Sequence, residues 1–213
     1  DEGDPFNKLK FEKSIAKLKA RNLFGEVKYK IQDGTSSDLK LVQIQVEEKP
    51  TGEITAGAGI GTSGGSFAFS ISENNWLGKG INLATSLDVS AETLSGTLIV
   101  TDPNYNFSGN TLKYFVQNTS NDKPDSGFKN NITTTGIGTK FEQYNNIYLS
   151  PGLAVSYDDL QVESTASDAL KKQKGTFTDL SFDYGISADN RDRVYAPTDG
   201  YFTRFSQVLP LYS

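Results

Sequence analysis

The chain has 213 residues and a formal net charge of −5, and it contains no Cys, Met or His. These absences exclude disulfide bonds, thiolate and imidazole chemistry, and the usual sets of zinc ligands. The negative charge gives no support to nucleic-acid binding, and no apolar run approaches the ~20 residues of a membrane-spanning helix. Membrane-spanning strands are not excluded, because their alternating pattern gives a much weaker hydropathy signal.

The chain is expected to begin with an amphipathic helix over residues 4–22. Phe11, Ile15 and Leu18 follow the spacing of one helix face, and lysines fill the other. The lysine face is either solvated or in contact with anionic lipid. The missing initiator Met and the lack of a signal peptide indicate a fragment of a longer precursor.

Two alternating strands, Phe24–Ile31 and Leu39–Val46, are expected after the helix. With it they form a partial α+β domain, residues 1–48, which is too small to bury a stable core alone. We therefore expect an N-terminal portion of this domain to be missing. Residues 49–52 are expected to be a linker, because Pro and Gly end the strand before them. Residues 53–213 are expected to form the second domain.

The second domain opens with a predicted β-hairpin. Its first strand alternates a row of apolar residues with a row of small ones. The apolar row is Ile54, Ala56, Ala58 and Ile60, and the small row is Thr55, Gly57 and Gly59. A Gly-rich turn over residues 61–65 leads to a second strand, in which Phe67, Phe69 and Ile71 share one face.

The same alternation recurs in six further segments of roughly ten residues, and a ninth strand begins near Tyr201. The six segments are Ile81–Val89, Thr93–Thr101, Thr111–Asn118, Ile132–Phe141, Ile147–Tyr157 and Phe177–Ala188. Two folds fit this pattern. In a soluble sandwich the apolar residues face a core, whereas in a membrane barrel they face lipid and the polar residues line a wet interior.

The connections between strands favour the barrel. Every second connection is compact and carries aromatic residues, which we predict to lie at the membrane interface. They are Trp76, Tyr105, Phe107, Tyr144, Tyr148, Tyr195 and Tyr201. The other connections are polar, and two are expected to be long loops, Gln117–Asn131 and Asp158–Thr176. Alternate connections of a meander share one end of the sheet, and aromatic residues gathered at one end are typical of a membrane interface.

The predicted fold class is therefore mainly β. A partial α+β domain precedes an antiparallel up-and-down transmembrane β-barrel that is incomplete, with about eight strands and the start of a ninth. The N-terminal domain is expected on the side of the aromatic turns, which would be the periplasm.

Several motifs resemble those of the BamA family of outer-membrane protein assembly factors, in the family's order along the chain. Residues 3–27 are similar to the second half of a POTRA domain, although the glycine of Asn-Leu-Phe-Gly at 22–25 is displaced. VEEKPTG at 46–52 resembles the junction between the last POTRA domain and the barrel. The turns that resemble those of the family are ENNWLGKG at 73–80, DPNY at 102–105, with one extra Asn, and DRVYAPTDG at 192–200.

This resemblance implies a larger barrel of which the C-terminal half is absent. It implies a bacterial outer-membrane protein that folds and inserts β-barrel proteins, with its POTRA portion in the periplasm. The implied partners are unfolded outer-membrane proteins, Bam-type accessory lipoproteins and outer-membrane lipids, with no cofactor, no metal and no nucleic acid.

In this family the seam between the first and last strands is thought to open and template incoming strands. We expect the segment Ile54–Ile60 to pair with substrate strands, because its small residues weaken both the strand and its register. The alternative is that these residues only fit a tight bend of the barrel. In the POTRA domain, the strand with Val27, Tyr29 and Ile31 is a further candidate edge for strand addition.

Three other functions stay open. The protein could be a related translocation or secretion pore, of the TamA or two-partner secretion type, or a passive channel. An enzyme is the third alternative, and it would have to use one of the close carboxylate sets. These are Asp158 with Asp159, Asp179 with Asp183, and Asp189 with Asp192. We interpret them as residues of a wet interior or of loops and expect no catalytic, acid–base or Ca²⁺ site.

Overall fold

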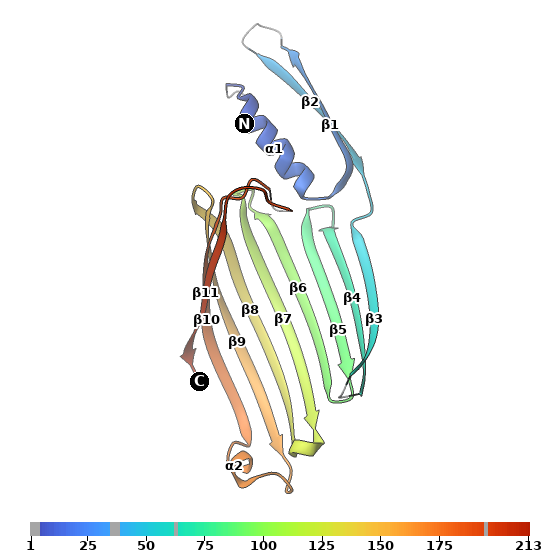
Figure 1. Cartoon of the computed structure of the whole chain (residues 1–213), viewed down its shortest axis with the longest axis vertical. Coiled ribbons are helices and arrows are strands. Elements are labelled where there is room, and N and C mark those ends of the chain that lie inside the picture. Colours follow the sequence, from blue (N-terminus) through green and yellow to red (C-terminus); the bar gives the residue numbers. More distant parts are fainter. Residues whose placement is uncertain (1–4, 35–38, 62–63, 194–195) are drawn as a thin grey trace. The chain divides into compact units, whose positions relative to one another are not determined.

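The computed structural model describes residues 5–34, 39–61, 64–193 and 196–213. The chain divides into two compact units, Asp1–Gly52 and Glu53–Ser213 (Figure 1). No helix in the described ranges combines the length and the apolar content needed to span a bilayer.

The first unit holds one helix, α1 (Lys8–Ala20), and two antiparallel strands, β1 (Phe24–Asp33) and β2 (Lys40–Glu48). The helix is shorter than the expected 4–22. It begins after Asn7, whose side-chain oxygen accepts a hydrogen bond from the Lys10 amide at 3.0 Å. Asn22 has a positive φ of 56°, which ends the helical path.

The small core of this unit lies between the helix and β1. Ile15 and Val27 are buried, and Phe11 packs edge-on against Tyr29 with ring centroids 5.0 Å apart. The register places Val46 opposite Val27, so the apolar residues of both strands share one face. Val46 is nevertheless 41% exposed, which leaves the β2 part of that face largely uncovered within the described residues.

The second unit is one antiparallel sheet in which each strand neighbours the next along the chain (Figure 1). Its strands are β3 (Gly52–Gly61), β4 (Gly64–Trp76), β5 (Ile81–Ser90), β6 (Thr93–Tyr105), β7 (Asn110–Lys123), β8 (Phe128–Tyr144), β9 (Ile147–Val162), β10 (Gly175–Asp189) and β11 (Phe202–Tyr212). A 3₁₀ turn, η1 (Pro124–Ser126), follows β7, and a short helix, α2 (Asp168–Lys171), precedes β10. The sheet is not closed into a barrel, because β3 and β11 are its two edges.

The register fixes which residues share a face. One row, the apolar row, runs through paired residues of seven strands: Leu83, Val100, Tyr114, Ile137, Leu153, Phe182 and Leu209. A second row, the polar row, runs across the opposite face: Ser70, Ser86, Thr97, Gln117, Thr134, Ser156 and Asp179. The predicted alternation is thus one continuous apolar face and one polar face of a single sheet.

Within the described residues of the second unit, no layer covers the apolar face. Among the described residues of the second unit, the buried apolar side chains are limited to Ala166, which lies in the loop before β10. In the apolar row itself, Tyr114, Ile137 and Leu153 are all exposed. A soluble sandwich would bury such a face against a second sheet, so the structure of this chain gives no support to that alternative.

The expected loop over Gln117–Asn131 is wrong. β7 continues to Lys123 and β8 begins at Phe128, so only a four-residue turn separates them. Polar side chains bridge the two strands there: the Asn118 amide donates to Asn131 at 2.7 Å and to Thr133 at 2.8 Å. A segment rich in Asn, Thr and Ser has the composition of a loop, but here those side chains pair across a ladder.

Trp76 and Tyr105 lie at strand ends rather than in the turns that the sequence predicts. β4 and β6 extend to these two residues through irregularities in register, between Glu73 and Trp76 and between Asp102 and Tyr105. These bulges admit extra residues into one strand while pairing continues. Sequence alternation breaks at such a point, which is why the strands are expected to end earlier.

Glycines on the two faces of the sheet differ in how much space surrounds them. A Cβ at Gly136 would lie 2.4 Å from the Phe115 ring and 2.8 Å from the Leu153 carbonyl oxygen. A Cβ at Gly96, on the apolar face, would meet nothing within 4 Å. The Phe115 ring therefore packs directly on the backbone of Gly136. A larger residue at position 136 would push β8 away from its neighbours.

We predict that Gly136→Ala lowers the free energy of unfolding by about 1–3 kcal/mol through overpacking. Gly96→Ala is the matched control and should be neutral or stabilise by up to ~1 kcal/mol, because it restricts only the unfolded chain. Urea unfolding in lipid vesicles, followed through the single tryptophan, measures both. Equal effects of the two substitutions would contradict this packing.

Candidate functional site

The apolar face forms a band of limited height. On β9 it runs from Ile147 to Tyr157, about 33 Å along the strand at ~3.3 Å per residue. With a strand tilt of ~40°, this corresponds to about 25 Å, the height of the apolar band of membrane barrels. Beyond Tyr157 the same face of β9 continues with Asp159 and Gln161. The apolar band is therefore shorter than the strand.

Exposed aromatic residues line the other limit of the band. Trp76 pairs with Ile81, and Tyr144 pairs with Ile147, so their side chains lie on the apolar face. The exposed fractions are high: 43% for Trp76, 51% for Tyr105, 93% for Phe107, 70% for Tyr144 and 58% for Tyr201. All five lie in the connections at one end of the sheet or at the strand ends next to them (Figure 1). Tyr195 lies outside the described residues.

Tyr148 differs from the other predicted interface residues. It pairs with Glu142, on the polar face, and the Lys140 ammonium lies 4.7 Å from its ring centroid. The alternation of β9 places Tyr148 on the face opposite Ile147 and Leu149, whereas the irregularity in β8 after Glu142 turns Tyr144 to the apolar face. Tyr148 thus belongs to a cation–π contact on the polar face.

Two of the aromatic turns are copies of the same structure, which sequence reasoning missed. In the first, Glu73 accepts a hydrogen bond from the Asn75 amide, and the Asn75 side chain accepts one from Gly80. In the second, Asp102 accepts from Asn104, and the Asn104 side chain accepts from Gly109 in the same way. The signal was an acid, an Asn two residues later and a Gly five residues after that. Each turn holds its aromatic residue, Trp76 or Tyr105, at the same place.

The predicted pairing segment is an edge of the sheet. β3, which holds the small row Thr55, Gly57 and Gly59, has β4 as its only neighbour among the described strands. Its apolar row, Ile54, Ala56, Ala58 and Ile60, is fully in the exposed class, with Ile54 71% and Ile60 95% exposed. The side of β3 away from β4 thus presents backbone N–H and C=O groups that another strand can pair with.

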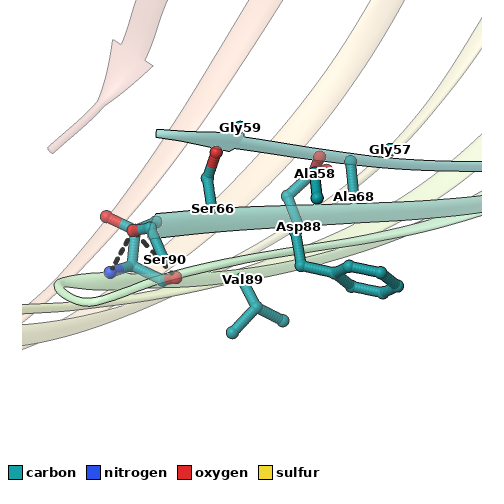
Figure 2. A pocket seen from close by; sticks show the side chains of 10 residues that line it. Gly57, Ala58, Gly59, Ser66, Ala68, Asp88, Val89 and Ser90 are labelled. Carbon is teal, nitrogen blue, oxygen red and sulfur yellow. Dashed lines mark hydrogen bonds between the residues drawn. The ribbon is translucent and has the colours of Figure 1, made fainter. Parts of the chain in front are cut away.

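A shallow hollow lies on the polar face beside β3 (Figure 2). Ser66 reaches toward Gly59, where a Cβ would lie 3.1 Å from its hydroxyl oxygen, and Val89 points to the opposite side of the sheet (Figure 2). A Cβ at Gly57 would meet nothing within 4 Å. The hollow therefore results from small residues, and these leave β3 with few side-chain contacts.

The candidate edge strand of the first unit is present, with Val27 buried while Tyr29 and Ile31 are 40% and 37% exposed. Val27 is 8% exposed, Tyr29 packs on Phe11, and Ile31 shares their face. β1 has β2 as its single neighbour in the described part of this unit. A strand added to β1 would pair with its backbone, and the side chains of that strand on this face would lie next to Val27, Tyr29 and Ile31.

The carboxylate sets do not form a site. Asp158 and Asp159 are successive residues of β9 and point to opposite faces. Asp183 lies over Gly152, and Asp189 is paired with Arg191 at 2.7 Å. Among the described residues, no three His, Cys, Asp or Glu side chains are placed to hold a metal ion.

Asp192 instead organises the connection between β10 and β11. Its carboxylate accepts hydrogen bonds from the Thr198 hydroxyl at 2.7 Å, the Thr198 amide at 3.0 Å and the Asp199 amide at 3.1 Å. Gly200 has a φ of +91°, and a Cβ there would lie 2.1 Å from the Asn190 carbonyl oxygen, so only glycine fits. The Pro-Thr-Asp-Gly motif fixes the shape of this turn.

The hydrogen bonds from Thr198, and then that from Asp199, hold the pKa of the Asp192 carboxyl below its ordinary value. The bonds therefore stabilise the turn above the pKa of an unfolded aspartate, ~3.9, and are lost as pH falls through the lowered pKa. We predict that the NMR amide signals of Thr198 and Asp199 titrate with a midpoint below ~3.9. In Asp192→Asn this titration should vanish. A midpoint at the ordinary value would contradict the hydrogen-bonded turn.

Comparisons with known proteins agree with this geometry. The Omp85 superfamily domain matches residues 75–211. The outer membrane protein assembly factor BamA of Neisseria meningitidis is 26% identical over 99% of this chain and 29% of its own length. BamA of Neorickettsia risticii is 23% identical over 78% of this chain and 23% of its own length. The chain thus spans less than a third of these curated relatives.

Two solved structures share the fold. The crystal structure of Haemophilus ducreyi BamA lacking POTRA domains 1–3 has a TM-score of 0.71 at 20% identity, over 94% of this chain and 42% of that one. CdiB from Escherichia coli has a TM-score of 0.66 at 17% identity, over 99% of this chain and 41% of that one. Since the domain match covers more than half of the sequence, the predicted family is confirmed: the chain belongs to the Omp85 superfamily, as a relative of the BamA proteins.

Proposed function

We propose that this chain is part of an outer-membrane protein assembly factor, which folds β-barrel proteins and inserts them into the bacterial outer membrane. In this proposal the second unit is about half of a transmembrane barrel. The observation that carries it is the uncovered apolar face of the sheet, together with the free edge of β3 and the similarity to BamA proteins.

The apolar face supports contact with acyl chains. A row that includes Leu83, Ile137 and Phe182 has no covering layer among the described residues of the second unit, and in water such a surface would aggregate. The opposite face, with the polar row, would line a wet interior. The exposed aromatic residues at one limit of the band have the amphipathic character favoured at the membrane interface.

The edge of β3 supports strand templating. Within hydrocarbon, unpaired backbone N–H and C=O groups cost several kcal/mol each, so an incoming strand gains strongly by pairing with them. Gly57 and Gly59 reduce the side-chain contacts that hold a strand in one register. A seam bordered by such a strand opens and pairs again more readily than one bordered by bulky residues.

The first unit would be the end of a periplasmic POTRA domain. β3 begins at the same end of the sheet as the turns that carry Trp76, Tyr105 and Tyr144, and short aromatic turns are typical of the periplasmic side. The partners would be unfolded outer-membrane proteins, Bam-type accessory lipoproteins and outer-membrane lipids. The backbone edge of β1 is a candidate for strand addition by a client or a lipoprotein.

A translocation or secretion pore is the second candidate, and the continuous polar face of the sheet, which would line an aqueous interior, favours it. Both functions need an apolar outer face and a polar interior. They differ in what the β3 edge does: an assembly factor pairs it with client strands, whereas a pore or passive channel keeps it closed and conducts. Ion conductance without any pairing at β3 would favour the pore.

Cysteine crosslinking tests the proposal directly, because the chain has no native cysteine. Thr55→Cys places the thiol on the edge strand β3. Thr97→Cys is the matched control, since β6 is paired on both sides, with β5 and β7. We predict that Thr55→Cys, in liposomes, forms a disulfide with an unfolded β-barrel client that carries one cysteine in a terminal strand.

The yield at Thr97→Cys should be at least about tenfold lower, because a strand with two neighbours has no free backbone to offer. A soluble protein with one cysteine, added in place of the client, measures non-specific reaction. Equal yields at the two positions, or equal yields with the client and the soluble protein, would refute templating at β3.

A further inference from the structure

The apolar face of the sheet changes character abruptly at the end opposite the aromatic turns. The last apolar pairs of the band are Val116 with Thr135 and Val155 with Leu180. The next row on the same face consists of Asn118, Thr133, Tyr157 and Thr178. Further rows hold Ser120, Asn131 and Asp159, and then Asp122, Lys129 and Gln161. Tyr157 thus marks the boundary between acyl-compatible and polar surface.

A hollow occupies these polar rows. Its lining includes Ser120 of β7, Lys129, Asn131 and Thr133 of β8, and Tyr157, Asp159 and Gln161 of β9. It lies on the same face of the same strands as the apolar band, directly beyond it. If the band contacts acyl chains, as in the proposed function on which this inference rests, the hollow sits at the depth of lipid headgroups.

Hydrogen bonds between side chains fix the polar groups in and beside the hollow. The Asn118 amide donates to both Asn131 and Thr133, which fixes the direction of those two side chains. The Gln161 amide donates to the Asp159 carboxylate at 3.1 Å. The Tyr157 ring, 48% exposed, stands beside them as an apolar platform.

We propose that this hollow binds the sugar headgroup of a membrane glycolipid. Amide and carboxylate groups that donate and accept side by side match the neighbouring hydroxyls of a sugar. An exposed tyrosine ring stacks on the apolar C–H face of a sugar ring while its hydroxyl stays wet. The acyl chains of the same molecule would then lie on the apolar band next to Val155.

The charges favour a neutral headgroup over a phosphate. Lys129 is the one cation of the lining, and its ammonium is paired with Asp122 at 3.2 Å. Asp159 adds a negative charge to the same hollow. An anionic headgroup would meet no uncompensated positive charge there.

A fluorescence experiment on the full chain tests the site. The single tryptophan is moved to the hollow by Trp76→Phe together with Tyr157→Trp, which keeps an aromatic ring at the platform. The chain is placed in phosphatidylcholine vesicles that contain increasing fractions of a galactosyl diacylglycerol with brominated acyl chains. Brominated phosphatidylcholine and brominated phosphatidylglycerol serve as the comparison lipids.

The galactolipid should reach half-maximal quenching at a mole fraction about fivefold lower than brominated phosphatidylcholine, the factor that one net hydrogen bond supplies. Asn131→Ala and Asp159→Ala, in the same reporter background, should remove that difference. Thr176 pairs with Asp159 from the next strand but lies outside the lining of the hollow. The control variant Thr176→Ala should therefore leave the difference between the two lipids unchanged.

Equal quenching by the three lipids would overturn the sugar site and leave membrane insertion standing, since bromine would still reach the reporter. Stronger quenching by phosphatidylglycerol would overturn it in favour of an anionic headgroup. A galactolipid preference that survives both alanine variants would overturn the assignment to these residues. No quenching by any lipid would overturn the inference together with the proposed insertion.

Discussion

The pairing register of the nine-strand sheet is the constraint on which the rest of the structure depends. Each strand alternates apolar and polar residues, but only the register aligns Leu83, Ile137 and Phe182 in one row across the sheet. A slip of one residue in any strand would move its apolar side chains to the opposite face. The hydrogen bonds that hold the register also satisfy the backbone groups, which neither hydrocarbon nor a closed interior could leave unpaired.

The middle strands of the sheet and its edge strand β3 differ in how many side-chain contacts hold the register. Cross-strand side-chain bonds reinforce β6 to β9, for example between Ser95 and Thr119 at 3.0 Å and between Thr134 and Ser156 at 3.0 Å. β3, at the edge, carries glycine and alanine instead. Strand pairing that is firm in the middle and weak at the first strand is the distribution that a seam for strand exchange requires. Other cross-strand bonds, from Asn118 to Asn131 and Thr133, lie beyond the apolar band and help to form the hollow there.

The mainly β antiparallel sheet and the alternation of its faces followed from the sequence, because a side-chain period of two is visible without knowing any contact. The family followed from the resemblance of several turn and junction motifs. The lengths of the strands could not be predicted from the sequence. Residues 117–131 look like a loop by composition, and only the partner strand turns Asn118 and Asn131 into a cross-strand pair. Tyr144 and Tyr148 were predicted to lie alike, but a bulge in β8 turns Tyr144 to the apolar face, whereas Tyr148 follows the alternation of β9 and lies on the polar face. The β3 edge, the POTRA assignment and the interface role of the aromatic residues stay predictions.

The most direct measurement compares two successive residues of β10, Phe182 and Asp183, which the register places on opposite faces. A nitroxide spin label is attached to Phe182→Cys or Asp183→Cys in the cysteine-free chain, inserted in bilayers. The account predicts that oxygen, which is concentrated in acyl chains, relaxes the label at 182 strongly, whereas a water-soluble nickel complex relaxes the label at 183. A label at 182 that neither reagent reaches would place that face in a dry protein interior and contradict the account.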